Sequence, residues 1–206
     1  MALKEEIDPE SHFIERFEAE LADLDEDVEI RPQLVESMRF QGRQLAPEAV
    51  PALYETFGEW KLIEAEEKLY EGISECEDYM FKGYIDLVIR TEDGKYHIID
   101  WKTCSWGWDA RKRSDPMVTY QLTLYKKYFA IKHDIDPSEI ETHFALLKRT
   151  AKRNQVEFID VSSGTIKTNN ATKLLMLALK NIENKKAIKN RLSCKGCQFY
   201  KTEHCI

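Results

Sequence analysis

The sequence predicts a mixed α/β (α+β) protein in which a central mixed sheet of about five strands is flanked by helices. Its 206 residues, 43 % of them hydrophobic, suffice for one sizeable core. Apolar periodicity alternates along the chain between helical and extended spacing, without internal repeats or a low-complexity linker. We therefore expect a single domain over residues 1–206.

The first part, residues 1–60, is predicted to be an acidic helical region. The stretch SHFIERFEAELADL places aromatic and leucine side chains four residues apart, as on one face of a helix. Three prolines are expected to divide the region into short pieces: Pro32, Pro47 and Pro51.

Extended and helical patterns follow in turn. WKLIEAEEKLYEGI indicates a strand of mixed polarity, which a loop at 71–78 joins to the hairpin GYIDLVIRTEDGKYHIIDWKT at 83–103. A long loop rich in Arg, Lys and Trp, 104–117, leads to a helix at about 117–132. ETHFALLKRT and NQVEFIDVS alternate as a second hairpin, and TNNATKLLMLALKNIENKKAIKN is a strong helix that Asn or Thr can cap.

The turn of the first hairpin decides what its two aspartates do. TEDGK allows a two-residue loop, which pairs Glu92 with Lys95, or a three-residue loop with Gly94 in the left-handed conformation. Only the three-residue loop leaves the opposite face of the hairpin apolar, so we predict it. That register sets Asp86 opposite Asp100.

Asp86, Asp100 and Lys102 are the candidate site. In this register they lie within cross-strand distance, roughly 5 Å between Cβ atoms. Directly opposed like charges are destabilising, so the pair calls for a cation, and a hard divalent metal with oxygen ligands is the natural candidate. The plainer alternative is a hairpin surface on which Lys102 neutralises both carboxylates.

GYID, then DWKT, then QLTLY, with a glutamate upstream, resemble the RecB-like branch of the PD-(D/E)XK nucleases over about residues 62–130. That branch includes the mitochondrial genome maintenance exonuclease and the CRISPR-adaptation nucleases. The resemblance implies a restriction-endonuclease-like catalytic core, which we place at residues 61–190, and hydrolysis of phosphodiester bonds in DNA.

The resemblance also implies roles for the candidate residues. Asp86 and Asp100 would bind Mg²⁺ or Mn²⁺ together with the backbone carbonyl of Trp101. Lys102 would hold the attacking water or the negative charge that develops on the scissile phosphate. This agrees with the chemistry of the residues, because a bound metal lowers the pKa of its water and neutralises charge in an in-line attack.

The resemblance implies further positions. The preceding strand is expected to supply a glutamate ligand, Glu66 as first choice and Glu67 as second. Gln121 and Tyr125 stand at i and i+4 on one side of a helix beside the site, where Gln can hydrogen-bond the catalytic strands or DNA and Tyr can contact the backbone. His12, the upstream histidine, matches the family poorly and is interpreted as a surface residue.

Charge is distributed unevenly along the chain. Residues 1–80 hold 7 basic and 23 acidic side chains, a net −16, whereas residues 81–206 hold 23 and 14, a net +9. The second part can therefore meet phosphates, although the whole chain carries −7. The candidate DNA-binding residues are Arg111, Lys112 and Arg113, with Trp106 and Trp108 available for base stacking, and a second cluster of Lys148, Arg149, Lys152 and Arg153.

Three of the five cysteines fall within a Cys-rich tail at 191–206: Cys194, Cys197 and Cys205. They resemble the C-terminal cysteines that, in iron–sulfur members of the family, bind a [4Fe-4S] cluster together with a cysteine far upstream. No cysteine precedes Cys76 here. A Zn²⁺ ion, held also by His204, and an unmetallated tail that packs the C-terminus are equal alternatives.

The sequence has no run of about 18 apolar residues and no basic-then-apolar leader, so we expect a soluble cytoplasmic protein without a membrane partner. An odd number of cysteines agrees with a reducing compartment. We expect a metal-dependent exonuclease in DNA recombination, repair or genome processing, of phage or prokaryotic origin. It carries no helicase motif and would act alone or with a helicase or recombination partner. The alternatives are a non-catalytic DNA-binding or protein-interaction subunit and a structure- or site-specific endonuclease.

Overall fold

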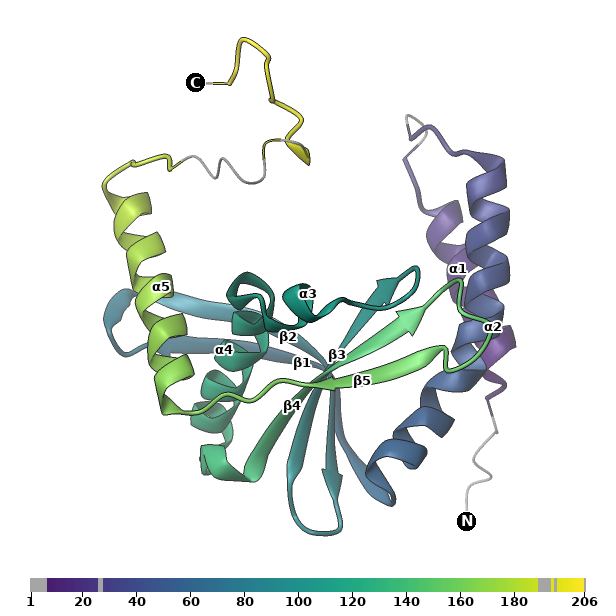
Figure 1. Cartoon of the computed structure of the whole chain (residues 1–206), viewed down its shortest axis with the longest axis horizontal. Helices are drawn as coiled ribbons and strands as arrows, with labels where there is room; N and C mark the ends of the chain where they lie inside the picture. Colours follow the sequence, from purple (N-terminus) through teal and green to yellow (C-terminus); the bar gives the residue numbers. More distant parts are fainter. Residues whose placement is uncertain (1–6, 26–27, 189–193, 195, 206) are drawn as a thin grey trace.

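The computed structural model describes residues 7–25, 28–188, 194 and 196–205 (Figure 1). The elements in chain order are α1 Pro9–Ala22, α2 Pro32–Phe57, β1 Trp60–Ile73, β2 Cys76–Thr91, β3 Tyr96–Cys104, α3 Ala110–Ser114, α4 Pro116–His133, the 3₁₀ turn η1 Pro137–Glu139, β4 Ile140–Lys148, β5 Val156–Asp160 and α5 Thr165–Glu183. The strands form one five-stranded sheet in the order β1-β2-β3-β4-β5. Only β3 and β4 are parallel among these neighbours, so the predicted mixed sheet is confirmed.

Helices cover both faces of the sheet. The smaller apolar core lies under α2 and includes Leu53, Ile99 and Ala145. The larger core lies under α4, around Phe129 and Phe144, and α5 packs on α4. Figure 1 shows α1 and α2 on one side of the sheet and α4 and α5 on the other. No helix among the described residues is both long and apolar enough to cross a membrane.

The central strand β3 has side chains buried on both faces. A parallel neighbour requires a crossover connection, and α4 supplies it between β3 and β4. The run from His97 to Asp100 is buried throughout. Polar side chains placed on this strand are therefore withdrawn from water unless they lie near its end.

The predicted register of the first hairpin is confirmed. The Thr91 N–H donates to the Lys95 carbonyl at 3.0 Å, and the Gly94 N–H donates to the Thr91 carbonyl at 3.0 Å. Gly94 has a φ of 88°, which is the left-handed conformation of a three-residue loop. Val88 pairs with Ile98, so the same register continues along both strands.

The prediction that prolines divide the N-terminal region was wrong for two of them. The single helix α2 runs through Pro47 and Pro51. Each proline removes a backbone N–H from the helix and disfavours the preceding turn. Leu45 and Leu53 are buried, and this tertiary packing outweighs the local preference.

Three further boundaries differ from the prediction. The loop at 71–78 is only Ser74 and Glu75, because β1 and β2 pair up to Ile73 and Cys76. The loop after β3 contains the short helix α3. The last helix begins after Gly164 and has no side-chain cap, so the predicted Asn or Thr cap was wrong; glycine is tolerated at this position. That helix ends at Glu183, and residues 189–190 of the predicted helix lie outside the described residues.

Gly94→Ala is expected to lower the free energy of unfolding by about 1–2 kcal/mol, because a Cβ atom disfavours the left-handed backbone. Gly72→Ala in β1 is the matched control, since its φ is not positive and no atom lies within 4 Å of the added Cβ. The control is expected to be neutral or slightly stabilising. Urea denaturation of both variants measures the difference, and equal losses would contradict the left-handed requirement at Gly94.

Candidate functional site

The strands β2 and β3 separate where the two aspartates face each other. Their backbone pairing ends at Leu87 and Ile99, one step before Asp86 and Asp100. Beyond this point the Trp101 N–H donates to Asp86 Oδ2 at 2.7 Å, so a side chain replaces the backbone partner. Extended backbone directs the N–H and C=O of a residue to the same side, so the Trp101 carbonyl also faces Asp86.

Asp100 is the most enclosed carboxylate of this site, with 1 % of its surface exposed. Lys102 Nζ lies 2.6 Å from Asp100 Oδ2, and Gln121 Nε2 donates to Oδ1 at 3.0 Å. Burial raises the pKa of Asp100 above its ordinary value; Lys102 opposes this rise and Asp86 adds to it. The carboxylate is therefore held by one cation and one amide, yet its charge is not fully compensated.

The helix α4 contributes two side chains to the site. Gln121 Nε2 donates to Tyr125 Oη at 3.1 Å as well as to Asp100. Gly83 of the GYID motif lets Tyr125 approach β2, because a Cβ at this glycine would lie 2.7 Å from Tyr125 Cε1. Sequence analysis assigned no separate role to this glycine, because only the distance between strand and helix reveals it.

Glu66 and Asp86 occupy the same row across the sheet. The pairs on either side, Ala65 with Leu87 and Glu67 with Ile85, place these two residues opposite each other. Glu66 is exposed and has a φ of 55°. A left-handed residue other than glycine stores strain, and such residues cluster at functional sites.

Glu67, the second choice for the metal ligand, has partners of its own. It is 5 % exposed, and Lys132 Nζ and His133 Nε2 lie 2.5 and 3.0 Å from its Oε1. Burial acts to raise the pKa of Glu67, but the hydrogen bonds from Lys132 and His133 outweigh it and leave the pKa below its usual range. Glu67 therefore joins β1 to the end of α4, which leaves Glu66 as the carboxylate in the row of Asp86.

The donor set of this row consists of oxygen atoms. Asp86, Asp100 and Glu66 offer carboxylates, and Trp101 offers a carbonyl. Hard divalent cations such as Mg²⁺ and Mn²⁺ prefer such ligands. The incomplete compensation of Asp100 also favours a cation beside it, so the donor chemistry fits the metal that the sequence motifs imply. In the described part of the chain, however, the carboxylates of Glu66, Asp86 and Asp100 do not come together as a group within 4.8 Å of one another.

The two predicted basic clusters lie close together at the end of β3. The Arg149 N–H donates to the Cys104 carbonyl at 2.8 Å, and the Thr150 N–H donates to the Ser105 carbonyl at 3.2 Å. These bonds fix the turn between β4 and β5 beside the segment that follows β3. Lys112 and Arg113 of this region have partners within the protein. We call the other exposed cations the basic edge: Arg111, Arg149, Lys152 and Arg153.

Several of the predicted DNA-binding residues instead make contacts within the protein. Trp108 is 8 % exposed and packs 5.0 Å from Phe144, so the prediction that it stacks on bases was wrong: its ring fills the core. Lys112 lies over that ring, at 4.4 Å from its centre. Arg113 and Lys148 both contact Glu157, at 2.6 and 3.3 Å. By contrast, Trp106 is 75 % exposed.

The cysteine tail forms successive turns, and the Cys197 N–H donates to the Cys194 carbonyl at 3.2 Å. In the described part of the chain, the cysteines do not bring three metal-ligating atoms within 4.8 Å of one another. His97, Glu141 and His143 do. Zinc or an iron–sulfur cluster at Cys194, Cys197 and Cys205 therefore stays a prediction. His12 is exposed on α1, as expected of a surface residue.

A mixed five-stranded sheet with D-x-K on its central strand is the arrangement expected of PD-(D/E)XK nucleases. The family model of the PD-(D/E)XK nuclease superfamily matches residues 2–202, and the chain belongs to this superfamily. A solved structure titled "Crystal structure of SSO0001" is similar to it, with a TM-score of 0.44, 17 % identity and 92 % of each chain covered. Among curated proteins, none matches the sequence.

Asp100→Asn is expected to raise the free energy of unfolding by about 1 kcal/mol at neutral pH in EDTA. The raised pKa means that the folded protein binds this proton more tightly than the unfolded chain. The stabilising contribution is therefore present below the unfolded-state pKa and is lost as the pH rises, and Asn mimics the protonated form.

Asp93→Asn is the matched control. Hydrogen bonds from the Thr91 hydroxyl and the Lys95 N–H lower the pKa of Asp93, so its loss is expected to destabilise the protein at neutral pH. Urea denaturation at neutral and acidic pH measures both variants. A destabilised Asp100→Asn at neutral pH in EDTA would contradict the raised pKa.

Proposed function

We propose that the protein is a Mg²⁺- or Mn²⁺-dependent deoxyribonuclease, and specifically an exonuclease that acts in recombination, repair or genome processing. One observation carries the proposal: the buried Asp100 is held by Lys102 and Gln121 at the point where β2 and β3 separate. Membership of the nuclease superfamily supports the reaction class and a DNA substrate. The resemblance of the motifs to an exonuclease branch supports action at DNA ends.

Asp86, Asp100, Glu66 and the Trp101 carbonyl would hold the metal. When bound, such an ion neutralises charge on the scissile phosphate and lowers the pKa of its water. Trp101 N–H fixes Asp86 through the bond at 2.7 Å. The protein thus sets the direction of this carboxylate before any ligand arrives.

Lys102 would orient the attacking water or stabilise the charge that develops on the phosphate. Its side chain is 33 % exposed, so the ammonium group can reach a substrate while its stem remains in the protein. The centre of the Phe144 ring lies 5.9 Å from Nζ of Lys102, and this contact restricts the conformations of the lysine side chain. Gln121 orients Asp100, and Tyr125 is hydrogen-bonded to Gln121 in turn.

The basic edge would guide the DNA strand toward the site. It lies beside the end of the strand that carries Lys102, and Trp106 offers an exposed ring for a base. The acidic part of the chain, 1–80, would stay away from the phosphates or bind a partner protein such as a helicase. A non-catalytic subunit would have no need of Lys102 beside the buried Asp100, so we favour the enzyme.

The decisive experiment uses linear and circular DNA, single- and double-stranded, labelled at either end, with Mg²⁺ or Mn²⁺. We expect metal-dependent shortening from an end, which EDTA and Lys102→Ala both abolish. Lys61→Ala, an exposed lysine of β1, is the matched control and is expected to leave the rate unchanged. Cleavage of closed circles would indicate an endonuclease, and an inactive, folded, metal-loaded protein would contradict the proposal.

Glu66→Gln is expected to lower the cleavage rate at least about 100-fold, because the row of carboxylates loses a charged ligand. Glu67→Gln is expected to change the rate only slightly but to lower the free energy of unfolding by roughly 1–3 kcal/mol, because Lys132 and His133 lose a charged partner. Initial rates and thermal unfolding distinguish the two positions. The reverse pattern would assign the ligand to Glu67.

Arg111→Ala is expected to weaken DNA binding and to reduce the slope of log K against log salt by about 0.7–0.9, the value for one phosphate contact. Arg16→Ala in α1 is the control, because it lies in the acidic part of the chain. Fluorescence anisotropy with Lys102→Ala protein and Ca²⁺ prevents cleavage during the titration. Equal slopes for all proteins would remove Arg111 from the interface.

A further inference from the structure

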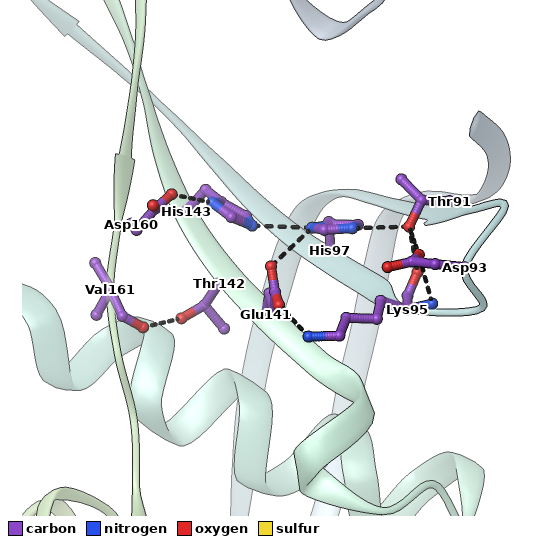
Figure 2. A network of polar contacts seen from close by, with 9 residues as sticks. All are labelled: Thr91, Asp93, Lys95, His97, Glu141, Thr142, His143, Asp160 and Val161. Carbon is purple, nitrogen blue, oxygen red and sulfur yellow. Dashed lines mark hydrogen bonds and ion pairs between the residues drawn. The ribbon is translucent and has the colours of Figure 1, made fainter. Parts of the chain in front are cut away.

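A second polar cluster lies on the face of the sheet opposite the nuclease site (Figure 2). His97 of β3 pairs with Glu141 of β4, and His143 is two residues further along β4 on the same face. The ring of Phe57 from α2 packs 4.8 and 5.0 Å from the two imidazoles. Asp100, by contrast, contacts α4, so the two clusters are separated by the sheet.

The potential ligand atoms converge at metal-binding distances. His97 Nδ1 lies 3.0 Å from His143 Nε2 and 3.7 Å from Glu141 Oε2. Zinc bonds of about 2.0–2.1 Å in tetrahedral geometry imply ligands roughly 3.3–3.4 Å apart. The two observed separations lie on either side of this value, so small shifts of the side chains would bring all three atoms to zinc-binding distance.

The hydrogen bonds around the cluster determine which ring nitrogens carry protons. His143 Nδ1 lies 2.8 Å from Asp160 Oδ1, and because a carboxylate only accepts, Nδ1 carries the hydrogen. The Thr91 hydroxyl donates its single proton to Asp93 Oδ1 at 2.5 Å. It must therefore accept from His97 Nε2, which lies 3.0 Å away.

This assignment leaves two lone pairs facing each other. Nδ1 of His97 and Nε2 of His143 are both without a hydrogen, and the carboxylate of Glu141 lies beside them. A divalent cation would satisfy all three atoms at once.

Each ligand also has an outer partner. Asp160 binds His143, Thr91 binds His97, and Lys95 Nζ lies 2.5 Å from the second oxygen of Glu141. Metal-binding histidines typically donate their other ring N–H to a carboxylate or another oxygen in this way, which fixes the ring and the tautomer. Figure 2 shows these contacts as one continuous chain of dashed lines.

We propose that His97, Glu141 and His143 form a Zn²⁺ site that is separate from the nuclease centre. Two imidazoles and one carboxylate suit zinc, whereas Mg²⁺ and Mn²⁺ prefer oxygen ligands alone. The three residues also line a cavity of about 510 Å³, together with Phe57, Glu59 and Glu92 among others, which leaves space beside them for a water or another ligand. The ion joins β3 to β4 beside the turn that sets the hairpin register, so it stabilises the sheet.

The test uses a parent protein that carries Cys194→Ser, Cys197→Ser and Cys205→Ser, because the tail could bind zinc itself. Excess Mg²⁺ occupies oxygen-rich sites during the titration. We expect the folded parent to bind one Zn²⁺ per chain, to unfold at higher temperature with zinc, and to give a Co²⁺ spectrum without a thiolate charge-transfer band.

His143→Gln and Glu141→Gln are each expected to weaken zinc binding at least about 10–100-fold and to lose the zinc-dependent rise in unfolding temperature. His12→Gln and Glu139→Gln are the matched controls, both exposed, and are expected to behave like the parent. Unchanged zinc affinity in the cluster variants, or a folded parent that binds no zinc, would overturn the proposal.

A measurement on the parent alone guards against a misfolded variant. In nitrogen NMR spectra of the metal-free protein, we expect the Nε2–H tautomer of His97 and the Nδ1–H tautomer of His143. Zinc should shift the resonances of the two opposite nitrogens, Nδ1 of His97 and Nε2 of His143. Unshifted imidazole resonances in saturating zinc would refute the site.

Discussion

The hydrogen bond from the Trp101 N–H to Asp86 is the interaction on which the proposed active site depends. It ends the backbone pairing of β2 and β3 without leaving a donor unsatisfied. Because the strands separate here, the backbone of Trp101 has no ladder partner in β2. A continuous ladder would have paired this part of the central strand with β2.

The position of Asp100 explains why several elements serve one carboxylate. A central strand gives a rigid attachment but removes the side chain from water, and an ionised group there is unfavourable without partners. Gln121 donates a hydrogen bond to one oxygen, and Lys102 forms an ion pair with the other. Glu67 and Lys132 hold α4 against β1. The free protein thus gives up stability at the site in exchange for a carboxylate whose direction is fixed in advance.

Sequence reasoning succeeded where the deciding contacts are local. Gly94 allowed the length of the hairpin loop to be predicted. That loop length sets which residues of β2 and β3 pair, and so it placed Asp86 opposite Asp100. It failed where distant packing decides: α2 continues through its prolines, and Trp108 turns into the core. The histidine cluster was missed because its members, 46 residues apart, carry no spacing signal and meet only through a parallel strand pair.

The strand β3 serves both faces of the sheet with alternate side chains. Asp100 and Lys102 point toward α4, whereas His97 and Trp101 point toward α2. Deleting or inserting one residue in the loop around Gly94 would shift the register by one residue. The side chains that now point toward α4 would then point toward α2, and the reverse. Drift in loop length is therefore restricted to even steps, and a surface turn that lies beside only one of the two sites constrains the evolution of both.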